Sequence, residues 1–365
     1  MRPTYLEVNL PQLKKNIEAI RAQVTPAKVM AMVKANAYGH GVDGVAPFLE
    51  PYVDYFGVAL VEEGIHLREL GIRKPILVGG AAMAEQVSLF AEYDLTLTGS
   101  SVELLDVAEE VSRSSGNRIK THLKIDTGME RVGVREYEAE ALILRASAYR
   151  HLDVEGIYTH LANSEAADRT YSNRQLERFQ AVLDLYEQHS LPVPSLRHVC
   201  NSGGILNLPH AYFDMVRAGV MVYGVYPGEE VDRIVDIDPA LTWRSRVAFS
   251  KRTQPGRPVS YGSLWQAEVE TRLVTIPCGY GDGYFRRMTN HAQVLIHQKM
   301  YPQVGRICMD QFMVNVGDDD IRVGDEVTLL GEGIRVEDLA GWMGTNEYEV
   351  MTNISARVPR VYLYE

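Results

Sequence analysis

Apolar runs alternate with amphipathic stretches along the first two-thirds of the chain. The stretches carry apolar residues at spacings of three and four, as in 11–20 and 173–186, which predicts helices. A short first strand is predicted at 5–10. The later runs predict eight more strands, at 29–33, 55–59, 75–79, 95–98, 120–125, 154–160, 195–200 and 215–223. Eight strands separated by helices over about 220 residues are typical of a (β/α)8 barrel.

The pattern changes near residue 235, where the helical spacing gives way to short strand-like runs. Strands are predicted at 241–249, 270–276, 293–297, 303–308, 312–316 and 326–330, and one helix at 336–343. Turn sequences such as Gln254-Pro255-Gly256 separate the runs. We therefore predict an α/β fold, with a (β/α)8 TIM barrel over residues 1–235 and a mostly β C-terminal domain over 236–365. An open doubly wound sheet is the alternative, but no GxGxxG follows the first strand.

Composition narrows the function classes. The 365 residues carry a net charge of −11, which argues against a nucleic-acid partner. Cys200, Cys278 and Cys308 have no metal-binding spacing, and three scattered cysteines are typical of a reducing compartment. No run approaches the roughly 20 apolar residues of a membrane span, and the N-terminus lacks the apolar stretch of a signal peptide. We expect a cytoplasmic protein with no membrane, nucleic-acid or metal partner.

Lys34 is the most informative residue, because it ends an apolar run and opens a loop that contains Gly39 and Gly41. Desolvation at the end of a buried strand lowers the pKa of a lysine. An amine with a lowered pKa can form a Schiff base with an aldehyde. The alternative is a lysine that simply extends from the strand into water.

Other polar residues fall at the ends of the predicted barrel strands, where reactive groups gather in this fold. They are Lys124, Asp126, His160, His198 and Arg217. Burying each one unpaired is costly, so together they suggest a polar pocket. The loop Asn201-Ser202-Gly203-Gly204, with Gly219 and Val220 one strand along, offers amides and a hydroxyl to an anion. A reactive lysine beside a phosphate-binding loop points to pyridoxal 5′-phosphate as the cofactor.

Several motifs resemble those of bacterial alanine racemases, which are fold-type III pyridoxal phosphate enzymes. The segments that carry the resemblance span nearly the whole chain. They are Val33-Lys34-Ala35-Asn36-Ala37-Tyr38-Gly39-His40-Gly41, Lys124-Ile125-Asp126-Thr127-Gly128-Met129, Val259-Ser260-Tyr261-Gly262, Gly279-Tyr280-Gly281-Asp282-Gly283, Gly305-Arg306-Ile307-Cys308-Met309-Asp310 and Arg357-Val358-Pro359-Arg360. The first and the fifth are highly specific.

The resemblance implies a role for each matching residue. Lys34 and Tyr261 would be the two catalytic bases, and Lys34 would also hold the cofactor. The other cofactor-binding residues would be Tyr38, His160, Asn201, Ser202, Arg217, Gly219, Val220 and Tyr348. Arg131 and Met309 would bind substrate, and Lys124 matches a position that is often carbamylated. Tyr280, Asp168, Arg286 and Arg306 match the corridor that leads into the site.

The resemblance also implies the reaction and the assembly. The enzyme would interconvert L-alanine and D-alanine by moving the α-proton between Lys34 and Tyr261, and would supply D-alanine for peptidoglycan. Tyr261 would come from the second subunit of a homodimer with shared active sites. Two residues depart from the family's pattern. Glu130 stands where glycine is usual, and Ala218 stands where proline is usual.

Alternatives remain open at this point. A serine racemase or one of broad range is the nearest, since a hydrophobic pocket rejects an added hydroxyl only modestly. A fold-type III decarboxylase would place a carboxylate, not Arg217, at the pyridine nitrogen. A non-catalytic pyridoxal phosphate-binding protein would need neither Tyr261 nor the C-terminal domain. A barrel isomerase acting on phosphosugars is the last alternative.

Overall fold

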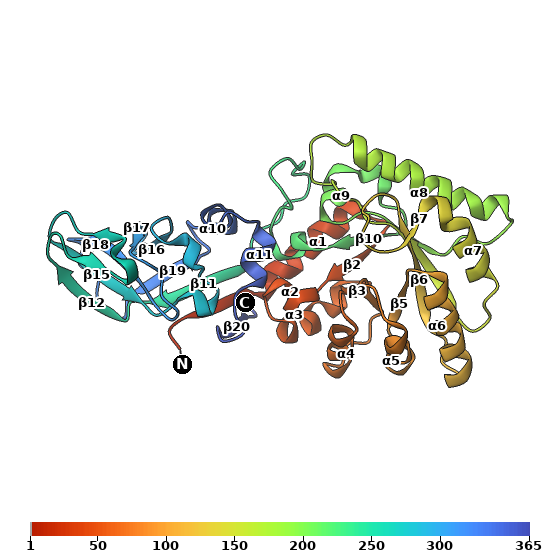
Figure 1. The fold of residues 1–365 in the computed structure, drawn as a ribbon, viewed down its shortest axis with the longest axis horizontal. Helices are drawn as coiled ribbons and strands as arrows, with labels where there is room; N and C mark the ends of the chain where they lie inside the picture. The colour runs from red at the N-terminus through yellow and green to blue at the C-terminus, as the bar shows by residue number, and fades with distance from the viewer. Residues whose placement is uncertain (1) are drawn as a thin grey trace. The chain divides into compact units, whose positions relative to one another are not determined.

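The computed structural model describes residues 2–365, which form two compact units. The barrel unit contains Gln12–Ala37 and Val42–Asp238. The β unit contains residues 2–11, Tyr38–Gly41 and Pro239–Glu365. The predicted fold class, a (β/α)8 barrel followed by a mostly β region, is confirmed (Figure 1). In the described part of the chain, no helix is both long and apolar enough to cross a membrane.

Eight parallel strands form the wall of the barrel unit. In the order of the wall they are β10 (Met215–Ala218), β2 (Lys28–Met32), β3 (Tyr55–Val58), β4 (Ile76–Val78), β5 (Thr96–Gly99), β6 (Lys120–Asp126), β8 (Asp153–Tyr158) and β9 (Leu196–His198). Short β7 (Val134–Arg135) also pairs with β6. The wall nearly closes between β9 and β10, where the Arg217 amide donates to the Cys200 carbonyl at 2.9 Å.

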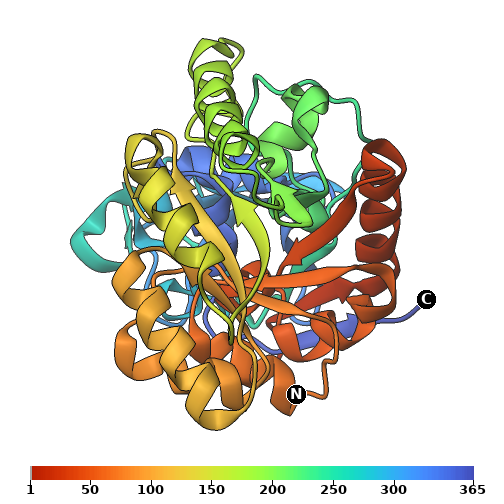
Figure 2. The ribbon, with the colours of Figure 1, turned by 90° about the vertical axis from the view of Figure 1, so that its right-hand side faces the viewer.

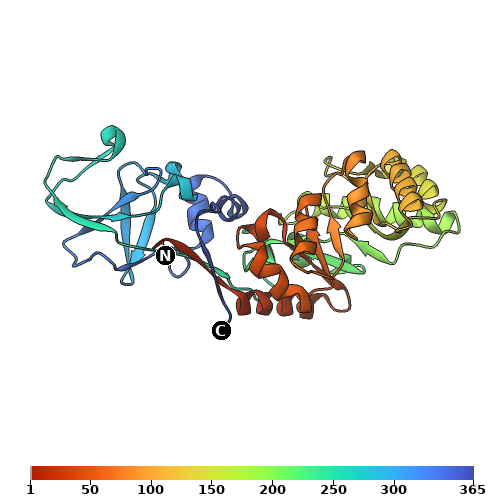
Figure 3. The same ribbon diagram turned by 90° about the horizontal axis from the view of Figure 1, so that it is seen from below.

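Helices cover the outside of this wall (Figures 2 and 3). They are α1 (Leu10–Val24), α3 (Val42–Leu49), α4 (Val61–Glu69), α5 (Val87–Glu92), α6 (Val102–Ser115), α7 (Ala139–Ser147), α8 (Thr170–Gln188) and α9 (Ser202–Asn207). The predicted helices at 11–20 and 173–186 lie within α1 and α8. Helix α6 shows how sequence sets the ends, since the Ser101 side chain caps its first turn and Gly116, at φ 76°, ends it.

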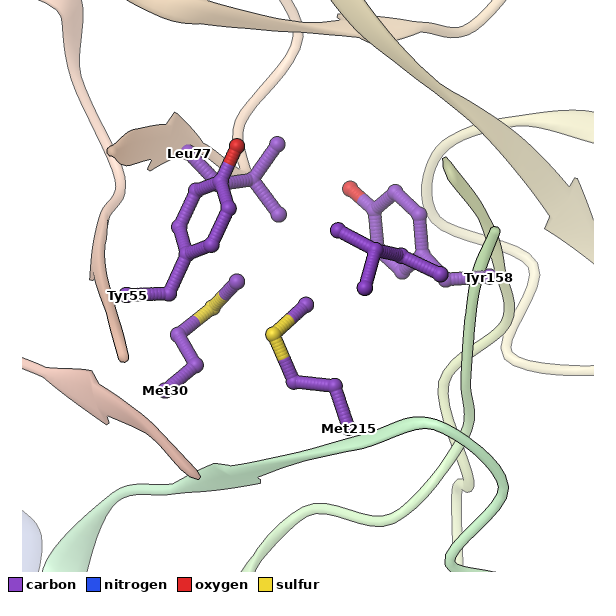
Figure 4. Packing of buried hydrophobic residues seen from close by; sticks show 6 residues of the cluster. Met30, Tyr55, Leu77, Tyr158 and Met215 are labelled. Atoms are coloured by element: carbon purple, nitrogen blue, oxygen red, sulfur yellow. The ribbon is translucent and has the colours of Figure 1, made fainter. Parts of the chain in front are cut away.

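The barrel interior is a packed core of large side chains from different strands. Met30, Tyr55, Leu77, Tyr158, Leu196 and Met215 form one buried cluster. Figure 4 shows the two methionines beside each other, near the two tyrosine rings. Next to this cluster the interior is polar, because the side chains of His122 and His198 are fully buried there.

A nine-stranded sheet forms most of the β unit. Its order is β12 (Phe249–Thr253), β15 (Thr271–Ile276), β18 (Phe312–Gly317), β17 (Lys299–Val304), β16 (Gln293–Ile296), β19 (Glu326–Leu330), β11 (Leu241–Arg246), β1 (Tyr5–Asn9) and β20 (Arg360–Leu363). The hairpin β13 (Pro258–Val259) and β14 (Trp265–Gln266) forms a separate two-stranded sheet, and Val259 packs against Leu273 and Val304 of the larger one. Helix α10 (Val336–Met343) has the predicted bounds, and α11 (Glu347–Thr352) was not predicted.

Three predicted strands differ from the structure. The strand expected at 241–249 is two strands, β11 and β12. The one expected at 303–308 is β17, which ends before Gly305 because that residue has φ 70°. The one expected at 215–223 ends at Ala218 and is followed by the 3-10 turn η5 (Val220–Tyr223). In addition, β1 was assigned to the barrel domain but pairs with β11 and β20 of the β unit.

Candidate active site

Lys34 follows β2 at its carboxyl end and opens a turn of unusual handedness, α2 (Lys34–Tyr38). Ala35, Asn36 and Ala37 have φ of 52°, 56° and 53°, which is the left-handed region. Left-handed helical backbone costs roughly 1–2 kcal/mol per non-glycine residue, so the turn must be held in place. The Glu63 carboxylate accepts from the Ala35 amide at 2.6 Å, and the Asn36 side chain accepts from the Val42 amide at 2.8 Å. Strain of this kind is typical of functional sites.

The environment of Lys34 favours the neutral amine. Burial lowers the pKa of Lys34, and the charge of Arg131 lowers it further, against the opposing effect of Glu63. A neutral amine is the reactive form toward an aldehyde. The lowered pKa is the direction that the sequence predicts for a lysine at the end of a buried strand.

Arg217 lies on β10 and donates into the barrel interior. Its Nη2 atom donates to the carbonyls of Thr159 and Val199 at 2.9 and 2.8 Å and lies 3.3 Å from Nδ1 of His160. Burial lowers the pKa of Arg217 to about 10, so the guanidinium stays charged at neutral pH. Burial and then the charge of Arg217 lower the pKa of His160 well below its usual value. His160 is thus a neutral imidazole in contact with a fixed cation.

The predicted anion-binding loop is brought together around α9. The Asn201 side chain accepts from the Gly204 amide at 3.0 Å, and the Ser202 hydroxyl accepts from the Gly219 amide at 3.0 Å. A Cβ atom on Gly203 would lie 2.5 Å from the Ser164 hydroxyl oxygen, so the close approach needs glycine there. Val220 begins η5 directly after Gly219. This concentration of amides and hydroxyls suits a phosphate group.

Lys124 is a buried amine without a hydrogen-bond partner in the described structure. Its Nζ atom lies 4.6 Å from the centre of the Tyr158 ring. Burial, followed by the charge of Arg217, lowers the pKa of Lys124 well below its usual value. An unpartnered buried polar group needs an explanation, such as a modification or a bound group.

Asp126 organises the loop that carries Arg131. Its carboxylate accepts from the amides of Gly128, Met129, Glu130 and Arg131 at 2.8 to 3.1 Å. Against the raising effect of burial, these four bonds hold the pKa of Asp126 below its usual range. The loop is therefore fixed by an ionised carboxylate, and it keeps Arg131 close enough to lower the pKa of Lys34.

Glu130, one of the two departures, forms an exposed ion pair. Its carboxylate lies 2.8 Å from Nη2 of Arg135, and both side chains are largely exposed. Glu130 also has φ 51°, which explains why glycine suits this position. The structure gives no account of Ala218, which is simply buried in β10.

We expect the Glu130→Gly variant to be more stable than the parent protein by about 1 kcal/mol, because glycine relieves the left-handed backbone of a non-glycine residue. The exposed ion pair with Arg135 contributes little that could be lost. Denaturant unfolding measures the change. Glu130→Ala is the matched control, since it removes the ion pair and keeps the strained φ. A glycine variant no more stable than the alanine variant would contradict this account.

In the β unit the site candidates lie on neighbouring loops. Tyr261 is 71% exposed on the turn η6 (Tyr261–Ser263), and the preceding hydroxyl of Ser260 donates to the Arg306 carbonyl at 2.6 Å. The Tyr280 amide donates to the Cys308 carbonyl at 3.0 Å, next to Met309. The structure thus brings Tyr261, Arg306, Tyr280 and Met309 to one region of this unit.

The remaining candidates are placed as follows. Tyr38 and Tyr348 are ring neighbours in the β unit, with centroids 6.1 Å apart. Arg286 is exposed on η8 (Arg286–Met288), and the Thr289 hydroxyl that ends this turn accepts from the Ile307 amide at 3.2 Å. Asp168 belongs to the barrel unit, where it is exposed and accepts from the Thr170 amide at the start of α8.

Sequence reasoning missed His122, Glu155 and Tyr158, and it noted His198 without a role. His198 and Tyr158 stack with centroids 4.6 Å apart, and the interplanar angle is 5°. The sequence could have indicated His122, because every second residue of a strand lies on the same face, and His122 shares its face of β6 with Lys124 and Asp126.

Comparisons with known proteins agree with the resemblance. The family description "Alanine racemase, N-terminal domain" matches residues 8–227, and "Alanine racemase, C-terminal domain" matches residues 240–362. The alanine racemase of Carboxydothermus hydrogenoformans is 41% identical over 370 residues, covering 100% of both chains. That of Desulforamulus reducens is 40% identical and covers 99% of both chains.

Solved structures are similar over the same length. An alanine racemase from Clostridium difficile has a TM-score of 0.95 at 36% identity and covers 100% of this chain and 96% of its own. One from Bacillus anthracis with bound L-Ala-P has a TM-score of 0.93 at 32% identity, covering 100% of this chain and 95% of that one. One from Bartonella henselae, described with covalently bound pyridoxal phosphate, has a TM-score of 0.91 at 27% identity and covers 100% of both chains.

Proposed function

The chain belongs to the alanine racemase family, and from this premise we propose that Lys34 and Tyr261 are the two groups that move the α-proton of alanine. Membership makes it an isomerase that depends on pyridoxal phosphate. The observation that carries the assignment of Lys34 is its place just after β2, where burial and the charge of Arg131 lower the pKa of its amine.

Pyridoxal phosphate supplies, when bound, an electron-withdrawing ring that makes the substrate's α-carbon acidic. Inversion at that carbon needs one group to remove the proton from one face and another to return it to the opposite face. Lys34 serves one face through its Nζ atom, and Tyr261 serves the other through its hydroxyl oxygen. When the reaction runs in the reverse direction, the two groups exchange roles: the one that returned the proton now removes it.

The other residues bind and orient. Ser202, Gly219 and Val220 would hold the cofactor phosphate, together with Asn201, Tyr38 and Tyr348. Arg217 would bind at the ring nitrogen, and His160 would pack against the ring. Arg131 holds the substrate carboxylate, and Met309 of the second subunit offers its amide to the substrate. The fields of Arg217, Arg131 and Lys34 all reach His160, which supports a single site for them.

The corridor through which substrate reaches the site is formed by Tyr280, Asp168, Arg286 and Arg306.

The assembly is a homodimer with two shared sites, supported by the exposure of Tyr261 on a turn of the β unit. The enzyme is cytoplasmic, in agreement with its three free cysteines, and it supplies D-alanine for peptidoglycan.

Proton exchange tests the function directly. With pyridoxal phosphate in heavy water, the protein should exchange the α-proton of both alanine enantiomers and convert each into the other. Serine, run in parallel, measures the breadth of the pocket. Equal rates with serine would indicate a broad-range racemase, and exchange of only one enantiomer without inversion would contradict the two-sided mechanism.

Lys124 is proposed to carry a carbamate. Its neutral, unpartnered amine can attack CO2, which forms an N–C bond, releases one proton and leaves an anion that orients Arg131. We expect protein grown with 13C-bicarbonate to show one carbamate signal that Lys124→Met lacks. The same variant should lower kcat/KM by about 10²-fold, because Arg131 loses its orientation. Lys120→Met, on the same strand, is the control. A parent protein without the signal would contradict the proposal.

A further inference from the structure

A row of hydrogen-bonded side chains crosses the barrel interior from Arg217 to Glu155. Nη1 of Arg217 lies 2.9 Å from Nδ1 of His198. Nε2 of His198 lies 2.9 Å from Nδ1 of His122, and Nε2 of His122 lies 3.2 Å from Oε1 of Glu155. Both imidazoles are fully buried, and the Glu155 side chain is 22% exposed. We call these four residues the Arg217–Glu155 row.

The chemistry of the groups fixes the direction of every bond in the row. A guanidinium can only donate, so Nδ1 of His198 is an acceptor and carries no proton. A neutral His198 therefore has its proton on Nε2 and donates to Nδ1 of His122. His122 in turn has its proton on Nε2 and donates to Glu155. Burial lowers the pKa of both imidazoles, which agrees with two neutral rings.

The row that begins at the cation Arg217 ends at an anion, the Glu155 carboxylate. The bonds of Arg217 all go to backbone carbonyls and to the imidazoles of His198 and His160. Burying a cation without an anionic partner costs free energy, so the oriented dipoles of the His198 and His122 imidazoles help to stabilise the charge of Arg217. Against the raising effect of burial, hydrogen bonds from His122 and Tyr55 hold the pKa of Glu155 below its usual value. An ionised carboxylate at one end polarises each hydrogen bond along the row.

We propose that Glu155 is a positioning residue for Arg217, which it acts on through the ordered imidazoles of His122 and His198. The row fixes the guanidinium as a donor at the site and so helps to direct the reaction toward proton transfer rather than transamination. This inference rests on the proposed function of Arg217 at the ring nitrogen of the cofactor. A merely structural Glu155 would stabilise the barrel without reaching Arg217.

The first experiment needs neither cofactor nor turnover. Protein labelled with 15N-histidine should show His122 and His198 as neutral rings protonated at Nε2. In Glu155→Gln, which keeps an acceptor but removes the charge, the proton signals of both rings should move to lower frequency. The shift at His198 is decisive, because Glu155 does not contact that ring.

Tyr55→Phe is the matched control. The Tyr55 hydroxyl donates to the same carboxylate oxygen at 2.6 Å, so its loss makes Glu155 a stronger acceptor. The His198 signal should then stay in place or move in the opposite direction, whereas general loosening of the barrel would move both variants alike. The spectrum of the parent protein decides the donor order even if a variant does not fold.

The second experiment uses the cofactor-loaded enzyme. Glu155→Gln should lower kcat about 10-fold, as is typical when a group behind a contacting residue is changed, with KM nearly unchanged. The fraction of turnovers that ends in transamination should rise, toward the larger rise expected for Arg217→Glu. Tyr55→Phe should match the parent enzyme in both respects.

Protonation of His198 at Nδ1 would overturn the proposal. So would a Glu155→Gln effect confined to His122, together with kinetics equal to those of Tyr55→Phe. A parent protein that does not racemise alanine would instead refute the proposed function, and the order of the row would remain measurable.

Discussion

Replacing Lys34 with alanine should lower kcat for alanine racemisation by at least about 10³-fold, since the variant would lose both the proposed proton-transfer group and the proposed covalent anchor. The structure explains why no neighbour can substitute. Lys34 follows β2 and opens a strained left-handed turn, and burial and the charge of Arg131 lower the pKa of its amine. The buried amine of Lys124 comes from a different strand, β6, and lies over the Tyr158 ring.

Chemical labelling checks the same residue without kinetics. Borohydride reduction of the cofactor-loaded protein should attach the cofactor permanently to the peptide that contains Lys34. Lys120→Ala is the control, because Lys120 lies at the start of β6 and pairs with Asp94 at 3.3 Å. It should keep full activity and full labelling. A label on any other peptide, or an active Lys34→Ala variant, would refute the assignment.

Mixing two inactive variants should restore activity. Lys34→Ala and Tyr261→Ala chains, unfolded together and refolded, should regain about a quarter of the parent activity if a two-fold dimer shares its sites. Random pairing makes half of the dimers mixed, and each mixed dimer has one intact site of two. Tyr261 is suited to such sharing, since it stands 71% exposed on the turn between β13 and β14.

A second mixture provides the control for this experiment. Lys34→Ala and Arg217→Glu both alter the barrel unit, so every site of their mixed dimer keeps one damaged barrel. That mixture should racemise alanine no faster than the two variants alone, whereas the first recovers. If the first mixture forms dimers, as sedimentation can show, and yet stays inactive, Tyr261 does not act across subunits.

The sequence by itself determined the elements and most of their order. Strands and helices follow the local period of apolar residues, so the eight barrel strands, α8 and the bounds of α10 could be predicted. The position of a residue at a strand end also follows from local pattern. That is why the sequence alone could single out Lys34, Lys124 and Arg217 as candidate site residues.

Tertiary structure decided everything that depends on contacts between distant segments. Strand β1 pairs with β11 and β20, more than 200 residues away, and no local period records that choice. Likewise, His122 and His198 are 76 residues apart in sequence, and they meet because only β8 separates their strands, β6 and β9, in the barrel wall. Two further properties belong to the barrel interior: the Lys124 amine is buried without a partner, and the hydrogen bonds from Arg217 to Glu155 run in one direction. Both depend on tertiary structure, because a buried polar group can pair only with the few groups that the fold places within hydrogen-bond distance.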